Sequence, residues 1–490
     1  MKLTFKNIIA SLLFQIVTII CGFIVPRLII SNYGSDVNGL VTSITQFLAY
    51  ITLLEAGFGA VIKAVLYKPI VKNDKETIKK ILKASEKIFR KISYIFIAYI
   101  IILCFVFPLI VSKDFDSVYT ISLILIISIS TFSEYYFGMT YKLFLHADQK
   151  PYVTYYIQIF TLILNTILVV ILVKLGASIQ IVKLVSASIF IFRPILHNIY
   201  VKKKYNISLK GVDDTYVIKQ KWNALFNHIA YIIRSNTDVA VLTIFSSIKE
   251  VSVYAVYMLV INSIKSVTYS FTGGIDASFG KTIAKGEHEK VNDRFKKFVT
   301  YYYTVSSVLF IATFFLIVPF ISLYTKGISD VNYIRPTFAY IMLAATFMLS
   351  IKDPYNDLVK VVGHFKQTQK GAFLEAILNI VISIALVFNY GLVGVAIGTL
   401  VSTTIRTIEL MFYATKNILK TSIFHFVKSI LLIIIEFALI YLIIYLIGDF
   451  NISNYIDWII YAIIVTSITI LVIIPTNLIF NKNICKIRRK

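Results

Sequence analysis

Long apolar segments recur along the whole chain and are separated by short polar stretches. Most reach about 20 residues or more, the length that an α-helix needs to cross the hydrocarbon core of a bilayer. The segments lie at 7–31, 40–66, 92–112, 118–145, 152–174 and 179–200, and then at 222–247, 251–280, 298–325, 335–362, 371–389, 392–414, 424–447 and 457–480. This pattern predicts an all-α membrane protein with about 14 transmembrane helices.

The second part of the chain repeats the first. The matching positions are Glu134 and Lys352, Lys142 and Lys360, His146 and His364, Gln149 and Gln367, Asn165 and Asn379, and Pro108 and Pro319, at an offset of about 218 residues that drifts by a few. A parallel duplication inside a membrane protein is typical of two-lobed transporters. We therefore expect an N-terminal six-helix lobe over 1–200, a linker over 201–221, a C-terminal six-helix lobe over 222–415, and two additional helices with a basic tail over 416–490.

Composition and charge agree with a membrane location. The chain is 58% hydrophobic and only 15% charged, with a mean hydropathy of +0.80. Its net charge of +24 could suggest nucleic acid, but the basic residues gather in connections such as 68–91, 201–221 and 281–297 and in the tail. The positive-inside rule places these connections in the cytoplasm. We expect a multi-pass protein with both termini in the cytoplasm and no nucleic-acid partner.

Neither a cofactor nor a catalytic site is expected. The three cysteines have no pairing spacing, and the six histidines are scattered without the spacing of metal ligands. The connections on the opposite side of the membrane do not exceed about ten residues. A membrane enzyme of glycan assembly needs a larger outer loop to hold its acceptor, so the sequence favours transport over catalysis.

Charged residues deep within the apolar segments are the candidate site. A lipid-facing charge costs about 3 kcal/mol, so seven would cost about 20 kcal/mol, which exceeds a typical net folding stability. These side chains must therefore face protein or a water-filled cavity. They are Glu55, Glu134, Arg234, Asp238, Lys265, Lys352 and Asp353, with Arg27 near the end of the first segment.

Some of these charges have alternative interpretations. Arg234 and Asp238 are four residues apart on one helix face, so they could form a salt bridge with no ligand role. Glu134 and Lys352 occupy equivalent repeat positions with opposite charges, and could pair across the pseudo-twofold axis as a gate. Arg27 could be an interfacial anchor instead of a cavity cation.

Local sequence around other candidates gives further expectations. Pro354 directly follows Lys352 and Asp353 and is expected to interrupt their helix, because proline lacks an N–H donor. Such a break beside two charges favours a cavity wall over a lipid-facing surface. The Gly394 and Gly398 pair indicates close packing of helices.

Several motifs resemble a known transporter family. They are Pro26-Arg27-Leu-Ile-Ile-Ser-Asn-Tyr-Gly34 with Val37-Asn38-Gly39-Leu40, the turn Ala147-Asp148-Gln149-Lys150, and Tyr390-Gly-Leu-Val-Gly-Val-Ala-Ile-Gly-Thr-Leu-Val-Ser402. Together they resemble the polysaccharide transporter branch (flippases of O-antigen and capsule repeat units, Wzx-like) of the multidrug/oligosaccharidyl-lipid/polysaccharide exporter superfamily. The likeness spans nearly the whole chain.

This resemblance implies two six-helix lobes around a central cavity and a flippase in a bacterial plasma membrane. The implied substrate is an undecaprenyl-diphosphate-linked oligosaccharide, moved from the cytoplasmic to the outer leaflet for surface polysaccharide synthesis. The polysaccharide polymerase machinery is an implied partner. Cavity cations of the family bind the lipid diphosphate, and here Arg27, Arg234, Lys265 and Lys352 match that requirement by type and depth.

The four candidate carboxylates are assigned a second role, and two alternative functions are considered. The carboxylates Glu55, Glu134, Asp238 and Asp353 are expected to bind a coupling cation or sugar hydroxyls. The first rival is a cation-coupled multidrug antiporter of the same superfamily, whose cavity should be dominated by carboxylates. The second rival, a membrane enzyme, would need a catalytic pair that the sequence does not offer.

Overall fold

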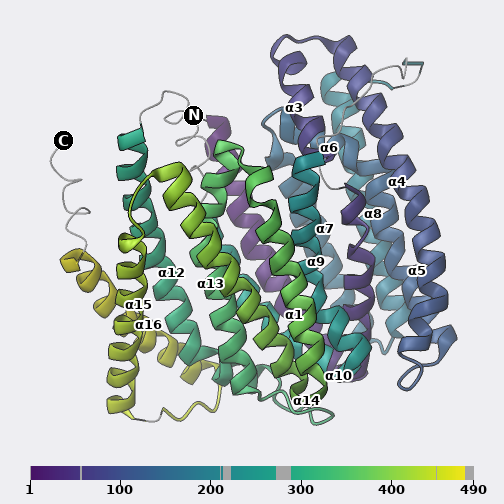
Figure 1. Cartoon of the computed structure of the whole chain (residues 1–490). Coiled ribbons are helices and arrows are strands. Elements are labelled where there is room, and N and C mark those ends of the chain that lie inside the picture. The colour runs from purple at the N-terminus through teal and green to yellow at the C-terminus, as the bar shows by residue number, and fades with distance from the viewer. Residues whose placement is uncertain are drawn as a thin grey trace. The chain divides into compact units, whose positions relative to one another are not determined.

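A computed structural model describes residues 2–55, 58–209, 211–212, 222–271, 288–448 and 450–480. Within these ranges the chain forms helices joined by short connections and contains no strand (Figure 1). Ten helical segments of the described chain are long and apolar enough to cross a membrane. The predicted fold class, an all-α multi-pass membrane protein, is confirmed.

The helices divide into two compact units, Met1–Ala255 and Val256–Lys490. The first unit contains α1 (Lys2–Ala49), α2 (Thr52–Glu55), α3 (Phe58–Val71), α4 (Lys75–Ile110), α5 (Ser117–Ser133), the π-helix η1 (Glu134–Gly138), α6 (Met139–Ala147), α7 (Pro151–Lys174), α8 (Ile179–Tyr205), α9 (Trp222–Phe245) and the start of α10 (Ile248–Ser270). The second contains the rest of α10 with α12 (His288–Tyr324), α13 (Pro336–Val362), α14 (Phe365–Ala414), the π-helix η2 (Thr415–Leu419), α15 (Phe424–Ile447) and α16 (Tyr455–Phe480).

Two long helices bend sharply at glycines where the sequence predicts turns between spans. α1 bends at Gly34 (φ 90°, ψ 166°) and α14 bends at Gly391 (φ 52°, ψ −127°). Residues with a Cβ rarely adopt these conformations. α14 therefore corresponds to the two predicted spans 371–389 and 392–414, whereas α1 contains the span 7–31 and only the start of 40–66, most of the rest of which lies in α2 and α3. The total of about 14 spans stays a prediction, since candidate spans are identified only within the described residues.

The expectation that 68–91 is a basic loop is wrong, because most of it is helical. α4 begins directly after Asp74, whose carboxylate accepts hydrogen bonds from the backbone N–H and the hydroxyl of Thr77 at 3.0 and 2.6 Å. These hydrogen bonds hold the pKa of the Asp74 carboxyl below its usual value. One turn apart, Glu86 and Arg90 form an ion pair at 2.7 Å. Such capping and i,i+4 pairing stabilise a polar helix outside the bilayer.

The expected interruption at Pro354 is also wrong, since α13 continues through this proline. Proline removes one backbone hydrogen bond and displaces the carbonyls of the preceding turn. In that turn the carbonyl of Ile351 accepts a hydrogen bond at 3.0 Å from the hydroxyl of Tyr303 on α12. A neighbouring side chain thus satisfies a backbone group beside the proline, which is how membrane helices tolerate proline without breaking.

The boundary between the compact units lies within α10. α9 packs on α1, where the hydroxyls of Ser43 and Thr243 are 2.8 Å apart. The start of α10 joins the same unit because Asn38 donates to the hydroxyl of Ser252 at 2.8 Å. The predicted lobe limits stay a prediction. Residues 213–221 of the expected linker, and the basic tail from residue 481, lie outside the described residues.

Candidate functional site

The eight predicted site residues all lie on described helices and are all buried or half-buried in the protein. Arg27 lies on α1, Glu55 on α2, Glu134 in η1, Arg234 and Asp238 on α9, Lys265 on α10, and Lys352 and Asp353 on α13. This placement agrees with the cost of exposing a charge to hydrocarbon. The two units each hold part of the set.

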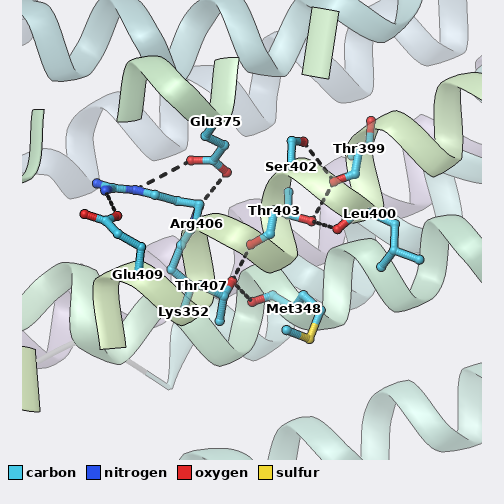
Figure 2. Close-up of polar contacts among 10 residues, drawn as sticks. All are labelled: Met348, Lys352, Glu375, Thr399, Leu400, Ser402, Thr403, Arg406, Thr407 and Glu409. Atoms are coloured by element: carbon cyan, nitrogen blue, oxygen red, sulfur yellow. Dashed lines mark hydrogen bonds and ion pairs between the residues drawn. The ribbon is translucent and has the colours of Figure 1, made fainter. Parts of the chain in front are cut away.

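A buried network of ion pairs surrounds Lys352 in the second unit (Figure 2). Its Nζ lies 2.8 Å from Oε1 of Glu375 on α14. The other oxygen of Glu375 lies 3.9 Å from Nε of Arg406, and the guanidinium of Arg406 also pairs with Glu409. Lys352, Glu375 and Arg406 are only 8%, 6% and 5% exposed. Two buried cations are therefore held by the buried carboxylate of Glu375, and Arg406 also by the partly exposed carboxylate of Glu409.

Gly371 and the hydroxyl of Thr407 help to position this network between α13 and α14. A Cβ at Gly371 would collide with the ends of the Arg406 and Glu409 side chains, so the absence of a side chain leaves room for their ion pair. Thr407, one residue after Arg406, donates from its hydroxyl to the carbonyl of Met348 on α13 at 3.1 Å. This bond fixes the register between the helices that carry Lys352 and Arg406 (Figure 2).

The two halves of α14 pack against each other after the bend at Gly391. A Cβ at Gly398 would lie 2.8 Å from the backbone nitrogen of Ser383, so only glycine permits this approach. Across the same contact, Asn379 donates to the hydroxyl of Thr399 at 2.9 Å. The predicted close packing at the glycine pair is confirmed. It places Glu375 and Arg406, which are 31 residues apart in sequence, within reach of one another.

Asp353 lies beside this network. Its Oδ2 is buried and makes no hydrogen bond within the described residues. The cations whose charges act on it most strongly are Lys265 of α10 and Lys352. Two predicted site residues of the second unit, Lys352 and Asp353, are adjacent on α13, and the charge of the third, Lys265, acts on Asp353.

In the first unit the predicted carboxylates take local partners. Glu134 pairs with Lys142 at 3.0 Å, and Glu55 accepts a hydrogen bond at 2.8 Å from the hydroxyl of Tyr135. Both partners come from the η1 and α6 region. Glu134 and Lys352, which the sequence suggested as a pair, are each bonded to a residue of their own unit.

The π-helical turn η1 brings Glu134 close to α8. A Cβ at Gly138 would lie 2.8 Å from Cβ of Pro194, which shows how closely α8 approaches this turn. Arg193 and His197 lie on either side of that proline, and the positive charge of Arg193 acts on Glu134. His197 is 1% exposed, and neither ring nitrogen has a hydrogen-bond partner within the described residues. π-helical turns inside helices are frequent at functional sites.

Arg234 and Asp238 on α9 both interact with Tyr254 of α10. Asp238 is buried and accepts a hydrogen bond at 3.1 Å from the hydroxyl of Tyr254 on α10. The charges of Arg234 and Asp238 both act on that hydroxyl. The roles predicted for Arg234 and Asp238, a cavity site or a salt bridge, stay predictions. Arg27 is half-buried on α1, ahead of the bend at Gly34.

Sequence reasoning missed Glu375 and Arg406, although both lie inside predicted apolar segments. The repeat offered a signal. Glu375 precedes Asn379 by four residues, as Thr161 precedes Asn165. In the first unit Arg193 of α8 donates to the hydroxyl of Thr161 on α7 at 2.8 Å. Equivalent positions in the two units are thus each contacted by an arginine from the following helix segment.

The chemistry of these clusters is that of binding. Buried guanidinium and ammonium groups provide several N–H donors for an anion. The carboxylates accept hydrogen bonds from hydroxyl groups, as the Tyr135 contact to Glu55 shows. No group of three or more His, Cys, Asp or Glu among the described residues is arranged to hold a metal ion.

Solved transporter structures share this fold. The chain is similar to the lipid II flippase MurJ in an inward closed conformation, with a TM-score of 0.68, 16% identity, and 98% of this chain and 99% of that chain covered. It is also similar to an inward-facing multidrug resistance MATE family transporter of the MOP superfamily, with a TM-score of 0.61, 12% identity and coverage of 82% and 94%. For the Vibrio cholerae MATE transporter VcmN in the bent form the values are 0.54, 14%, 85% and 97%.

No protein-family model matches the chain, and no curated protein matches it by sequence. At identities this low, the likeness to MurJ and MATE structures establishes a shared fold. The chain therefore has the fold shared by the MurJ and MATE transporters, and the resemblance to the polysaccharide transporter branch stays a prediction.

Proposed function

We propose that this chain is a flippase that moves an undecaprenyl-diphosphate-linked oligosaccharide from the cytoplasmic to the outer leaflet by alternating access. The observation that carries the proposal is the extent of the structural likeness. The likeness to the lipid II flippase covers 98% of the chain and so must include α15 and α16, whereas that to the MATE transporter covers 82%. The segment 416–490, which holds these two helices, is about 15% of the chain.

The buried cations support an anionic headgroup as the ligand. A diphosphate that crosses a region of low dielectric needs fixed positive partners. Lys352 and Arg406 meet this requirement, because both are buried, Lys352 on α13 and Arg406 in the candidate membrane span Phe365–Leu419. A guanidinium has five N–H donors, and the carboxylates of Glu375 and Glu409 engage only part of them. A diphosphate could therefore bind here by sharing or replacing these carboxylates.

We assign the remaining predicted residues by their chemistry. Arg27, Arg234, Lys265 and Lys352 contribute positive charge for the diphosphate. Glu55, Glu134, Asp238 and Asp353 bind sugar hydroxyls or a coupling cation. The hydrogen bond from the Tyr135 hydroxyl to Glu55 is a local example of the contact that a sugar hydroxyl would make. No bond of the substrate is broken in this cycle, so the protein acts as a transporter and not as an enzyme.

The proposal also implies a cellular location and an orientation in the membrane. We infer a bacterial plasma membrane, with both termini in the cytoplasm because the basic connections lie on that side. The flipped oligosaccharide would then be the substrate of a polysaccharide polymerase on the outer face, which makes that machinery a candidate partner.

Transport in proteoliposomes tests the proposal. The probe is a polyprenyl diphosphate that carries a fluorescent oligosaccharide, and the readout is its accessibility to a membrane-impermeant quencher over time. We expect Arg234→Ala and Lys352→Ala to slow flipping at least about ten-fold, since the loss of one charge-assisted hydrogen bond costs about 1.5–3 kcal/mol. Lys297→Ala, at an exposed pair with Asp293, is the matched control and should flip normally.

Two results would contradict the proposal. The first is full flipping by both variants, provided that each is recovered folded from the membrane. The second is no flipping by the natural chain, together with increased drug sensitivity of a deletion strain. That second result would favour the multidrug antiporter, the function named in the MATE structures of the same fold.

A further inference from the structure

Glu436 is a fully buried carboxylate outside the candidate site. It lies at the midpoint of α15 and is 0% exposed. Its Oε1 accepts hydrogen bonds from the hydroxyl of Thr476 at 2.6 Å and from the amide of Asn477 at 2.7 Å, both on α16. Its Oε2 is buried and has no partner within the described residues.

Among the described residues, no cation pairs with Glu436. The described cations of α12, Arg294, Lys296 and Lys297, lie within its first three turns. On α15, Lys428 lies near the start of the helix and donates to the backbone carbonyl of Phe480 at 2.9 Å. On α16 the ionisable Asp457 lies near the opposite end and accepts a hydrogen bond from Ser453 at 2.7 Å. On α12 the hydroxyl of Tyr303 is engaged with a carbonyl of α13. The groups that contact Glu436 are therefore neutral donors.

Glu375 is a buried carboxylate that has cationic partners, as an ionised carboxylate requires, and it serves as the comparison for Glu436. It is 6% exposed, and its two oxygens face Lys352 at 2.8 Å and Arg406 at 3.9 Å. Burying an ionised carboxylate without such a partner is strongly unfavourable, and the usual outcome is that the group binds a proton. Glu436 has the burial of Glu375 without its cations.

A small pocket lies beside Asn477, one of the two residues that donate to Glu436. It lies between α12, α15 and α16 and is lined by Thr300, Tyr303, Thr304, Ser307, Ser429, Leu432, Ile433 and Asn477. Asn477 thus contacts Glu436 on one side and forms a wall of the pocket on the other. The Ser307 hydroxyl is buried and makes no hydrogen bond within the described residues, which leaves it available to a water molecule.

We propose that Glu436, with Thr476 and Asn477, forms a proton-binding site in the C-terminal helix pair, which exchanges its proton through the hydroxyl-lined pocket. Oε1 remains the acceptor for Thr476 and Asn477, and the proton resides on Oε2. Membrane-embedded carboxylates without counter-ions are typical of proton sites. This inference goes beyond the flippase proposal and does not depend on the identity of the transported substrate.

Infrared spectroscopy of the full chain with ¹³C-labelled glutamate tests the site. At neutral pH we expect a carbonyl band from a protonated carboxylic acid. The band should be absent in Glu436→Gln and present in Glu375→Gln, the matched control. A spectrum that Glu436→Gln leaves unchanged would overturn the proposal. In D₂O the band should shift several-fold more slowly in Thr304→Val, and an unchanged rate would reject the pocket as the exchange route.

A second measurement needs no substitution, so it remains decisive if Glu436→Gln does not fold. Dicyclohexylcarbodiimide modifies protonated carboxyl groups in apolar surroundings, and peptide mass spectrometry locates the product. We expect modification of Glu436 that decreases as the pH is raised, with Glu375 unmodified throughout. No modification of Glu436 from acidic to alkaline pH, or equal modification of both residues, would refute proton binding at Glu436.

Discussion

At the scale of single residues, the charged side chains in the membrane-spanning helices are held by specific partners. Lys352 and Arg406 share Glu375, Glu134 binds Lys142, and Asp238 accepts from a tyrosine. A buried pair adds little net stability compared with an apolar pair. Removing one partner is costly, however, because an uncompensated charge stays behind. Each of these charges is thus stabilised only while its partner is present.

The first prediction concerns the buried network. Glu375→Gln should lower the free energy of unfolding by about 3–5 kcal/mol, because Lys352 then lacks its carboxylate partner. Denaturant titration of the purified protein in detergent measures this change. Lys297→Met, which removes a partly exposed pair with Asp293, should change it by less than about 1 kcal/mol. Equal small effects of the two substitutions would show that the buried pair does not contribute as described.

The second prediction concerns the hydroxyl that binds Glu55. Tyr135→Phe should reduce the free energy of unfolding by about 1–3 kcal/mol, because it removes the hydrogen bond to this carboxylate. The same titration measures it. The matched control is Tyr119→Phe, whose ring stacks on Phe115 and is retained in the variant, and which should lose less than about 0.5 kcal/mol. A larger loss in the control would contradict this account.

At the scale of helices, glycines decide where segments bend and how closely they approach. Gly34 and Gly391 adopt backbone conformations that disfavour other residues, and each divides one long helix into two helical segments. Gly39 serves a different purpose. A Cβ there would lie 2.9 Å from the carbonyl carbon of Ile248, at the start of α10. The Asn38-Gly39 pair of the recognised motif is therefore a contact between α1 and α10.

A third prediction tests this contact. Gly39→Ala should destabilise the protein by at least about 2 kcal/mol, because the new methyl group overlaps backbone that cannot rotate away. Gly22→Ala on the same helix is the control. A Cβ at Gly22 would meet nothing within 4 Å, so this change should be neutral or stabilise by up to about 1 kcal/mol. Thermal unfolding compares the two, and a normal melting temperature for Gly39→Ala would refute the packing described.

At the scale of the whole molecule, the duplication gives two units with related helices but different charges. In the first, Arg193 contacts the neutral Thr161, and in the second, Arg406 contacts the acidic Glu375 at the equivalent position. Glu134 of one unit corresponds to Lys352 of the other. The repeat has thus kept the positions of cross-helix contacts while the charges have diverged.

The fourth prediction concerns orientation in the membrane. Single cysteines are introduced by Lys72→Cys, between α3 and α4, and Asn451→Cys, between α15 and α16, after replacement of Cys21, Cys104 and Cys485. A membrane-impermeant maleimide should label Asn451→Cys in intact cells and Lys72→Cys only after permeabilisation, since basic connections stay in the cytoplasm. The reverse labelling would place the termini outside.

The sequence by itself determined the fold class, most span positions and which charges needed protein around them. Apolar length follows directly from the thickness of the bilayer, so the predicted segments 152–174 and 335–362 differ from α7 and α13 by one residue at most. The burial of Lys352 could likewise be expected, because exposing a charge to hydrocarbon costs too much. These properties depend on the residue and its near neighbours in the chain.

Only the tertiary structure decided the partners. Glu375 and Arg406 meet because α14 bends at Gly391 and folds back on itself. Neither the bend angle nor the rotation of the helix can be predicted from the local periodicity of the sequence. Pro354 was expected to break α13, but Tyr303 of another helix satisfies a carbonyl beside it. Contacts between residues distant in sequence depend on how helices pack, and small changes in rotation alter which side chains meet.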